Sequence, residues 1–324
     1  MTNHLPRTAL ILVLSFLFTF PVSAQTTAPI KEQDIRAELG FLASDELQGR
    51  GSGTIYEKKA AEYIGTQFRQ FGLEPGGDTD EAGKKSYLQH VRFNSGETWN
   101  AIGVIKGTEP GEAILLSAHL DHLGVNDTLS GDKIYNGADD DASGCIAVLE
   151  LARVLAAGQR PRRTIYFICF GSEERGGYGS RYFIANPPVP LTEIVANLTF
   201  EMLGRPDKKV PAGTLWLTGF ELSTLGPELA RQGAALVADP HPEQNFFRRS
   251  DNFPLALRGV IAHTVSSFGL HNDYHQPSDD ISKIDFPFMT RSLNSLVKPV
   301  QWLANSTFRP AWLPGKAPTR NERR

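Results

Sequence analysis

The apolar residues of this chain follow two spacings, and each spacing predicts a different element. From Glu32 to Leu42 and from Tyr56 to Phe71 they recur at helical intervals, which predicts two amphipathic helices, and Gly72 is a typical stop after the second. Further along, short apolar runs alternate with helical patterns. The runs NAIGVIKG, AILLSAHL, RTIYFICFG, EIVANLTFEM, TLWLTG and GVIAHTVSS indicate strands, and ASGCIAVLELARVLAAG, Leu222–Leu236 and Phe286–Leu303 indicate helices.

The strand segments are almost continuously apolar, so we expect helices to cover both faces of the sheet that they form. Their alternation with helices predicts a three-layer α/β/α sandwich around a mixed, mostly parallel sheet. No internal repeat, low-complexity tract or linker divides the sequence. We therefore expect one catalytic domain over residues 25–312, with a helical N-terminal lead-in, followed by a loose basic tail at residues 313–324.

Residues 1–24 have the features of a cleavable export signal. Arg7 precedes an apolar core from Ala9 to Phe20, and Val22-Ser23-Ala24 is a sequence that signal peptidase accepts. This core is shorter than the ~20 apolar residues that a comfortable membrane-spanning helix needs. We expect cleavage after Ala24 and a periplasmic or secreted protein without a membrane anchor.

Composition restricts the partners more than the function. The chain carries 33 Lys and Arg residues against 36 Asp and Glu, a formal net charge of −3, which argues against nucleic acid or an anionic membrane as a partner. The two cysteines, Cys145 and Cys169, lie in apolar segments. They are predicted to be buried thiols rather than nucleophiles, and their spacing leaves a disulfide between them undecided.

Polar residues gather where the predicted strands end, which is where ligands bind in open α/β sheets. His119 ends the strand AILLSAH. Two residues on, Asp121 points to the same side of an extended chain, where its carboxylate would hold the ring nitrogen that a metal leaves unused, whereas His122 points away.

Three consecutive aspartates, Asp139 to Asp141, precede the next predicted helix. One carboxylate is enough to cap a helix and to favour its dipole. Because three carboxylates in a row repel each other, a divalent cation explains the cluster better than capping does.

Further carboxylates and histidines follow the later strands. Glu173 and Glu174 come after RTIYFICFGS, and one of them could bind metal while the other handles a proton. Glu201 ends another apolar run, where a carboxylate is unfavourable unless it is paired or coordinated. His271 and His275 lie in the polar loop HNDYHQPSDD. His, Asp and Glu ligands without cysteine suit zinc in a hydrolytic site, or manganese or cobalt by substitution.

The segments SAHLDHLG, GADDDASG, SEERGGYGS, NLTFEMLGR and DYHQPSDD, in this order, resemble the co-catalytic dizinc aminopeptidases, the family of secreted bacterial leucyl aminopeptidases and aminopeptidase Y. The resemblance implies two Zn²⁺ per chain, with Mn²⁺ or Co²⁺ as substitutes. The residues it implies as metal ligands are His119 and Glu201 for one ion, Glu174 and His275 for the other, and Asp140 as the bridge.

The resemblance also implies roles beside the metals. Glu173 would be the general base, Asp121 would orient His119, and the peptide bond from Asp140 to Asp141 would be cis. Two positions depart from the family pattern. Many relatives carry aspartate in place of Glu201, and histidine is frequent in place of Asn252.

The resulting prediction is an exported metallo-aminopeptidase that acts on peptides with a free N-terminus. A carboxypeptidase or dipeptidase would use the same core, with Arg248 and Arg249 clamping a substrate carboxylate. A glutaminyl cyclase-like enzyme would work with one zinc, and the intact GADDDASG argues against it. A binding module that has lost catalysis would lack ligands or the base, and the sequence retains all of them.

Two further expectations concern the surroundings of the site. Phe246 and Phe247 are candidates for a pocket that receives an apolar side chain, although aromatic pairs are more often part of a core. Asp279, four residues beyond His275, either braces that imidazole or belongs to a polar turn.

Overall fold

The computed structural model describes Met1 and residues 29–319. Its strands are β1 (Glu74–Pro75), β2 (Leu88–Phe93), β3 (Gly96–Ile105), β4 (Ala113–His119), β5 (Gly124–Val125), β6 (Ile134–Tyr135), β7 (Thr164–Phe170), β8 (Ile194–Phe200), β9 (Leu215–Leu217), β10 (Leu236–Ala238) and β11 (Ala262–Ser266). Within the described residues, nine strands form one sheet in the order β1-β3-β7-β4-β8-β11-β9-β10, with β2 beside β3. β5 and β6 form a separate hairpin.

The centre of the large sheet is parallel and its margins are mixed. Strands β7, β4, β8 and β11 run in the same direction. On one side β3 pairs with β7 antiparallel, and on the other β9 pairs with β11 antiparallel. Because the four central strands are parallel, their carboxyl ends meet at one edge of the sheet.

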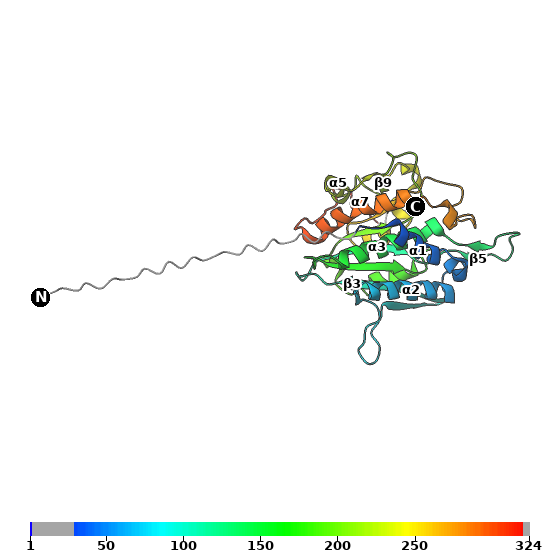
Figure 1. The fold of residues 1–324 in the computed structure, drawn as a ribbon, viewed down its shortest axis with the longest axis horizontal. Coiled ribbons are helices and arrows are strands. Elements are labelled where there is room, and N and C mark those ends of the chain that lie inside the picture. The colour runs from blue at the N-terminus through cyan, green and yellow to red at the C-terminus, as the bar shows by residue number, and fades with distance from the viewer. Residues whose placement is uncertain (2–28, 320–324) are drawn as a thin grey trace.

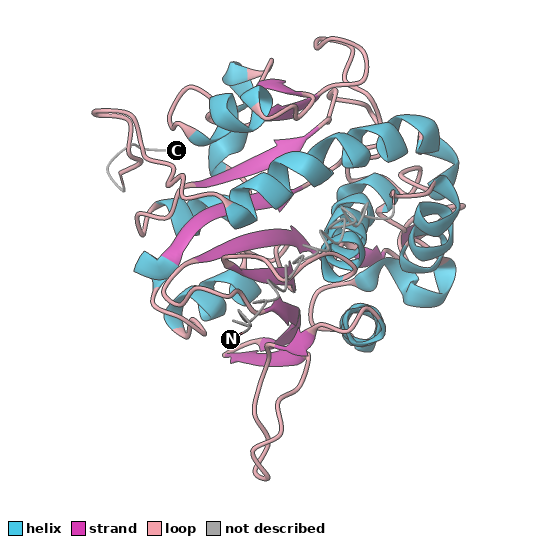
Figure 2. Ribbon diagram, turned by 60° about the vertical axis from the view of Figure 1, so that its left-hand side comes forward, coloured by secondary structure: helices cyan, strands magenta, loops and turns pink. Residues whose placement is uncertain are grey.

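Helices flank the sheet on both faces, as the sequence predicts (Figure 2). The helices are α1 (Glu32–Leu42), α2 (Ile55–Gln70), α3 (Gly144–Ala156), α4 (Tyr178–Ala185), α5 (Leu225–Arg231), α6 (Asn252–Ala256) and α7 (Phe286–Asn305). On one face α1, α3 and α7 pack together, with α2 against α3 and β3 (Figure 1). On the other face α4 contacts β2, β3 and α6. Each face buries its own apolar cluster.

The helix predicted over Leu222–Leu236 is shorter than expected. It forms only α5, Leu225–Arg231, because Gly233 follows with a φ of 101° and Leu236 then joins the sheet beside Leu215. The sequence analysis also did not anticipate α4, α6 or β2. These elements are short, with six residues in β2, eight in α4 and five in α6.

The ends of the chain fall largely outside the described residues. Apart from Met1, the predicted export signal at residues 1–24 lies outside them, and the predicted tail is described only to residue 319. Among the helices that are described, none has the length and apolar character needed to cross a bilayer.

A buried carboxyl group lies where α1 meets α3. Burial, followed by the charge of Glu150, raises the pKa of Glu38 to about 8. Within the described part of the chain, Glu38 Oε2 has no hydrogen-bond partner. Arg153 is bound to Glu150, at 2.5 Å between Nη2 and Oε2. Glu38 is therefore protonated in the folded protein at neutral pH.

Replacing Glu38 by glutamine should flatten the pH dependence of stability. The unfolded chain releases this proton near pH 4.5 and the folded chain near pH 8, so the free energy of unfolding falls as pH rises through this window. Glutamine does not ionise, and the variant should lose that slope. Urea unfolding at about pH 5 and about pH 8 measures the effect, with the exposed Glu81→Gln as control. If the unfolding free energy of Glu38→Gln fell with pH as steeply as that of wild type, the prediction would be contradicted.

Candidate metal centre

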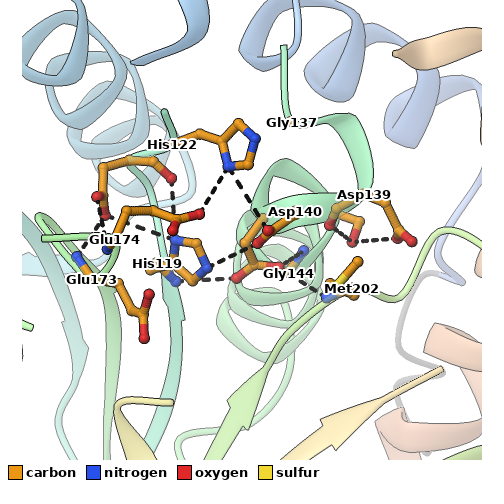
Figure 3. A network of polar contacts seen from close by, with 12 residues as sticks. His119, His122, Gly137, Asp139, Asp140, Gly144, Glu173, Glu174 and Met202 are labelled. Carbon is orange, nitrogen blue, oxygen red and sulfur yellow. Dashed lines mark hydrogen bonds and ion pairs between the residues drawn. The ribbon is translucent and has the colours of Figure 1, made fainter. Parts of the chain in front are cut away.

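Polar side chains leave the sheet where its central strands end (Figure 3). His119 is the last residue of β4, and Glu201 directly follows β8. Glu173 and Glu174 come three and four residues after the end of β7, and His275 lies in the loop after β11. The strand order β7-β4-β8-β11 makes these ends neighbours, so residues far apart in the sequence share one edge.

A first group of possible metal ligands consists of His119, Asp140 and Glu201. One ligand atom from each lies within 4.8 Å of the others. His119 Nε2 is 3.2 Å from Asp140 Oδ1, and both residues are at most 2% exposed. Two oxygen ligands and one imidazole nitrogen around a single point match the donor set of a catalytic zinc site.

A second group lies on the other side of Asp140. His275 Nε2 is 3.1 Å from Asp140 Oδ2 and 3.2 Å from Glu174 Oε1. The two oxygens of Asp140 therefore face different groups, Oδ1 toward His119 and Oδ2 toward His275. A carboxylate in this position can bind two ions at once, so the geometry fits a dinuclear centre.

The charges also fit metal ligation. Burial by itself raises the pKa of Asp140, but the imidazoles of His119 and His275 hold it well below its usual range. Asp140 is thus an ionised carboxylate in a buried position, which is the form that ligates a cation. Burial raises the pKa of Glu201 to about 7, and a bound cation would favour its ionised form.

His122 does not point away from this site, which corrects the sequence-based expectation. Its Nδ1 is 3.0 Å from Glu174 Oε1 and 3.8 Å from Asp140 Oδ2 (Figure 3). The expectation assumed that side chains alternate between the two sides of a strand as far as His122. Because β4 ends at His119, residues 120–122 do not continue that strand. One candidate ligand set in the structure consists of His122, Asp140 and Glu174.

The Asp121 carboxylate has other partners than the imidazole of His119. The ring Nδ1 of His119 is 3.1 Å from the backbone carbonyl of Asp121 and 3.7 Å from its Oδ1. The carboxylate instead accepts the N–H groups of Glu173 and Glu174, at 2.9 and 3.2 Å, and the hydroxyl of Ser52. Asp121 therefore orients His119 mainly through its main chain, and it holds the glutamate pair through its side chain.

The three consecutive aspartates have separate tasks. Only Asp140 faces the two ligand groups. Asp139 accepts the N–H of Gly204 at 2.7 Å and contacts His271 Nε2 at 3.0 Å. Asp141 accepts the N–H groups of His119 and Met202, each at 3.1 Å. The peptide bond between Asp140 and Asp141 is cis, as the resemblance implies.

Asp279 supports the aspartate turn and not the His275 imidazole. Its carboxylate accepts the backbone N–H of Asp139 at 3.1 Å and that of Asp140 at 3.0 Å. Burial, followed by the charge of Asp139, raises the pKa of Asp279 to about 8. Neither expectation for this residue describes these contacts, because the buried carboxylate binds a turn about 140 residues earlier in the chain.

Glu173 stands beside both groups without belonging to either set. It lines the cavity in front of them, and burial raises its pKa well above the usual range. Its backbone N–H is held by Asp121 Oδ1. A carboxylate with a raised pKa at the mouth of such a centre is suited to accept and return a proton.

The segment before α2 braces the site from behind, a role that the sequence analysis missed. Arg50, only 1% exposed, donates to the carbonyl oxygens of Leu42, Leu120, Asn136 and Gly137. Glu57 Oε1 accepts the N–H of Ser172 at 2.9 Å, just before the glutamate pair. Arg50 among the glycines of GRGSGT was the available signal, because a charged residue needs buried partners if the segment packs inward.

A small cavity of about 50 Å³ opens in front of the ligand groups. Its apolar wall includes Trp216, Phe246 and Phe268. Of the predicted aromatic pair, Phe246 lines this cavity, whereas Phe247 packs in the apolar cluster around α4 and α6.

Of the other residues singled out in the sequence, one lines the cavity and the rest pack away from it. Arg249 lines the cavity, with its guanidinium 4.9 Å from the Phe246 ring, and Arg248 lies over Phe253. Asn252 is fully buried and donates to the carbonyl of Phe247. Both cysteines are buried free thiols, as predicted.

Sequence comparison finds that this chain is similar to known peptidases. The model of peptidase family M28 matches residues 100–298. Leupeptin-inactivating enzyme 1 of Streptomyces exfoliatus is 29% identical over 192 residues, which are 57% of this chain and 39% of that protein. The chain thus spans well under half the length of this relative.

Solved structures share the fold at low sequence identity. A zinc aminopeptidase from Bacillus subtilis, BSAP, matches 86% of this chain and 96% of its own with a TM-score of 0.65 and 18% identity. Porphyromonas gingivalis glutaminyl cyclase matches 85% of this chain and 100% of its own, with a TM-score of 0.60 and 18% identity. At these identities the likeness shows a common fold.

Proposed function

This chain belongs to peptidase family M28, and on that basis we propose that it is an aminopeptidase with two zinc ions that removes N-terminal residues from peptides. The observation that carries the proposal is the position of Asp140. It offers one oxygen to the group of His119 and the other to the group of His275.

The ligand assignment follows from these groups. His119, Asp140 and Glu201 would hold one ion, and Asp140, Glu174 and His275 the other. Nitrogen and oxygen donors without thiolate suit zinc, with manganese or cobalt as possible substitutes. When bound, such a pair of ions lowers the pKa of water and polarises the scissile carbonyl.

Glu173 is the general base in this proposal. It accepts the proton of the attacking water and delivers it to the leaving amine nitrogen. Asp121 keeps Glu173 in place by accepting its backbone N–H. The Trp216, Phe246 and Phe268 side of the cavity would receive an apolar side chain at the peptide N-terminus.

One observation favours a second candidate, a carboxypeptidase or dipeptidase. Arg249 lines the cavity, where its guanidinium could bind a substrate carboxylate. A panel of aminoacyl, N-terminally blocked and C-terminally free peptides separates the two activities. Cleavage of blocked peptides at their C-terminus would replace the aminopeptidase proposal.

Removing metal should abolish activity and lower stability. A ligand that binds only the folded state adds about 2.7 kcal/mol to the unfolding free energy at one hundred times its dissociation constant. Chelator dialysis should therefore lower the melting temperature, and zinc should restore both stability and turnover. Metal analysis should give two ions per chain in the restored protein. Full activity in metal-free protein would contradict the proposal, and a single ion would favour the cyclase-like alternative.

Export belongs to the same proposal. It rests on the sequence of residues 1–24, with cleavage expected after Ala24. The N-terminal sequence of the protein recovered from the periplasm or medium tests it.

A further inference from the structure

His122 is one of the most enclosed polar side chains near the centre. The residue is 1% exposed, and its side chain is fully covered. Nδ1 faces Glu174 Oε1 at 3.0 Å, a hydrogen-bond distance, whereas Asp140 Oδ2 is 3.8 Å away. On the opposite side of the ring, Nε2 is buried without a hydrogen-bond partner among the residues that the structure describes.

These contacts decide which ring nitrogen carries the proton. If the proton were on Nε2, the unprotonated Nδ1 would place its lone pair against the carboxylate of Glu174. The buried Nε2–H would then have no acceptor. With the proton on Nδ1, the ring donates to Glu174 and only an acceptor is left unpaired. The ring nitrogen that faces the centre is thus a donor to a ligand.

The distances separate His122 from the second ligand group. His275 Nε2 is 3.1 Å from Asp140 Oδ2 and 3.2 Å from Glu174 Oε1, so it approaches both carboxylates about equally closely. His122 Nδ1 is 3.0 Å from Glu174 Oε1 but 3.8 Å from Asp140 Oδ2, so it approaches only one of the two carboxylates closely.

The backbone holds the His122 ring in this orientation. A Cβ atom on Gly137, whose φ is 56°, would lie 2.6 Å from ring atoms Cγ and Cδ2 of His122, so glycine is required for the ring to pack there. The N–H of His122 donates to the carbonyl of Arg50 at 3.2 Å. These contacts hold the imidazole, and reorienting it would require the turn before Asp140 to move.

We propose that His122 is a positioning residue of the second metal group. Its Nδ1–H donates to Glu174 Oε1 and fixes the carboxylate in the orientation that it shares with His275 and Asp140. This inference rests on the proposed function, because it presumes an ion between Glu174, His275 and Asp140. Hydrogen bonds to metal ligands typically change metal affinity about 10–100-fold.

The test measures zinc affinity in competition with a chromophoric chelator, which yields an association constant for each ion. His122→Ala and His122→Leu remove the donor, and His122→Asn keeps an amide N–H close to the position of Nδ1. Both donor-free variants should lower one association constant about 10–100-fold and leave the other unchanged. His122→Asn should remain within a few-fold of wild type. Because leucine fills the space of the ring, the test does not depend on the fold of the alanine variant alone.

His90 provides a matched control. Its Nε2 lies 2.7 Å from Glu97 Oε2, a histidine–glutamate contact of the same kind between β2 and β3. His90→Ala should change neither constant. The proposal is overturned if His122→Leu binds both ions as wild type does, or if His122→Asn is as weak as His122→Leu. Scalar coupling between bound ¹¹³Cd and the His122 ring in the wild type would also overturn it, because His122 would then be a ligand.

The outcome is distinct from that of the proposed function. The wild-type stoichiometry of two ions and chelator-sensitive aminopeptidase turnover test the function by themselves. The ratio of affinities between the His122 variants and the wild type tests only the positioning role.

Discussion

Glu173→Gln should abolish turnover while both metal ions stay bound. Glutamine keeps the size and the backbone contacts of Glu173, including the N–H that donates to Asp121 Oδ1 at 2.9 Å. It cannot accept a proton from water. Loss of a general base typically lowers the rate about 10²–10⁴-fold. The measurement is kcat on an aminoacyl substrate, together with metal content per chain.

A glutamate outside the site provides the comparison for this variant. Glu81→Gln makes the same chemical change in an exposed loop and should retain wild-type kcat. If Glu173→Gln turned over substrate at the wild-type rate with full metal content, another group would have to be the base. If it lost metal instead, Glu173 would have to be reassigned as a ligand.

Asp140→Asn should eliminate dinuclear metal binding, with a loss of activity at least as large as that of Glu173→Gln. Each Asp140 oxygen faces a different ligand group, at 3.2 Å from His119 Nε2 and 3.1 Å from His275 Nε2. Asparagine replaces one oxygen with an NH₂ group, which is not a zinc ligand. The variant can therefore offer an oxygen to one group only. Metal analysis and zinc titration should show the loss of at least one ion.

The stabilisation that zinc confers should change in parallel. Zinc should raise the melting temperature of Asp140→Asn less than that of wild type, because less binding free energy is linked to folding. Asp127→Asn is the control, since the Asp127 side chain is 92% exposed. Two tightly bound ions in Asp140→Asn would show that Asp140 is not the bridge.

Much of the fold follows from local pattern in the sequence. The predicted helix Glu32–Leu42 coincides with α1, and the runs AILLSAHL and RTIYFICFG contain β4 and β7. These segments are predictable because continuous apolar character demands burial on both faces, whatever the order of the strands. The helix predicted over Leu222–Leu236 is wrong at its end because a contact between distant segments decides the structure there. Its last residues form β10 because β9 is available beside them, and that pairing is not encoded locally.

In the candidate site, too, some features follow from local sequence pattern and others from contacts between distant segments. Strand-end positions pointed to His119, Glu173, Glu174 and Glu201, and the resemblance implied Asp140 and His275. The structure brings these residues together at one sheet edge. Their roles as ligands and base stay predictions that the variants above test. The sequence rule misplaced His122 because it extended strand geometry past His119, where β4 stops.

The sequence alone predicts which residues supply the chemistry, because most of the polar motifs follow predicted strands and parallel strands end at one edge. How those residues are held follows from contacts in the folded protein. Asp121 accepts the N–H groups of the glutamate pair, and Asp279 accepts those of the aspartate turn. Arg50 donates to the carbonyl oxygens of Leu120 and Gly137, just before Asp121 and the aspartate turn. The physical reason is that these hydrogen bonds join segments up to about 140 residues apart, as from Asp279 to Asp140. Local periodicity carries no information about such contacts, whereas packing fixes them.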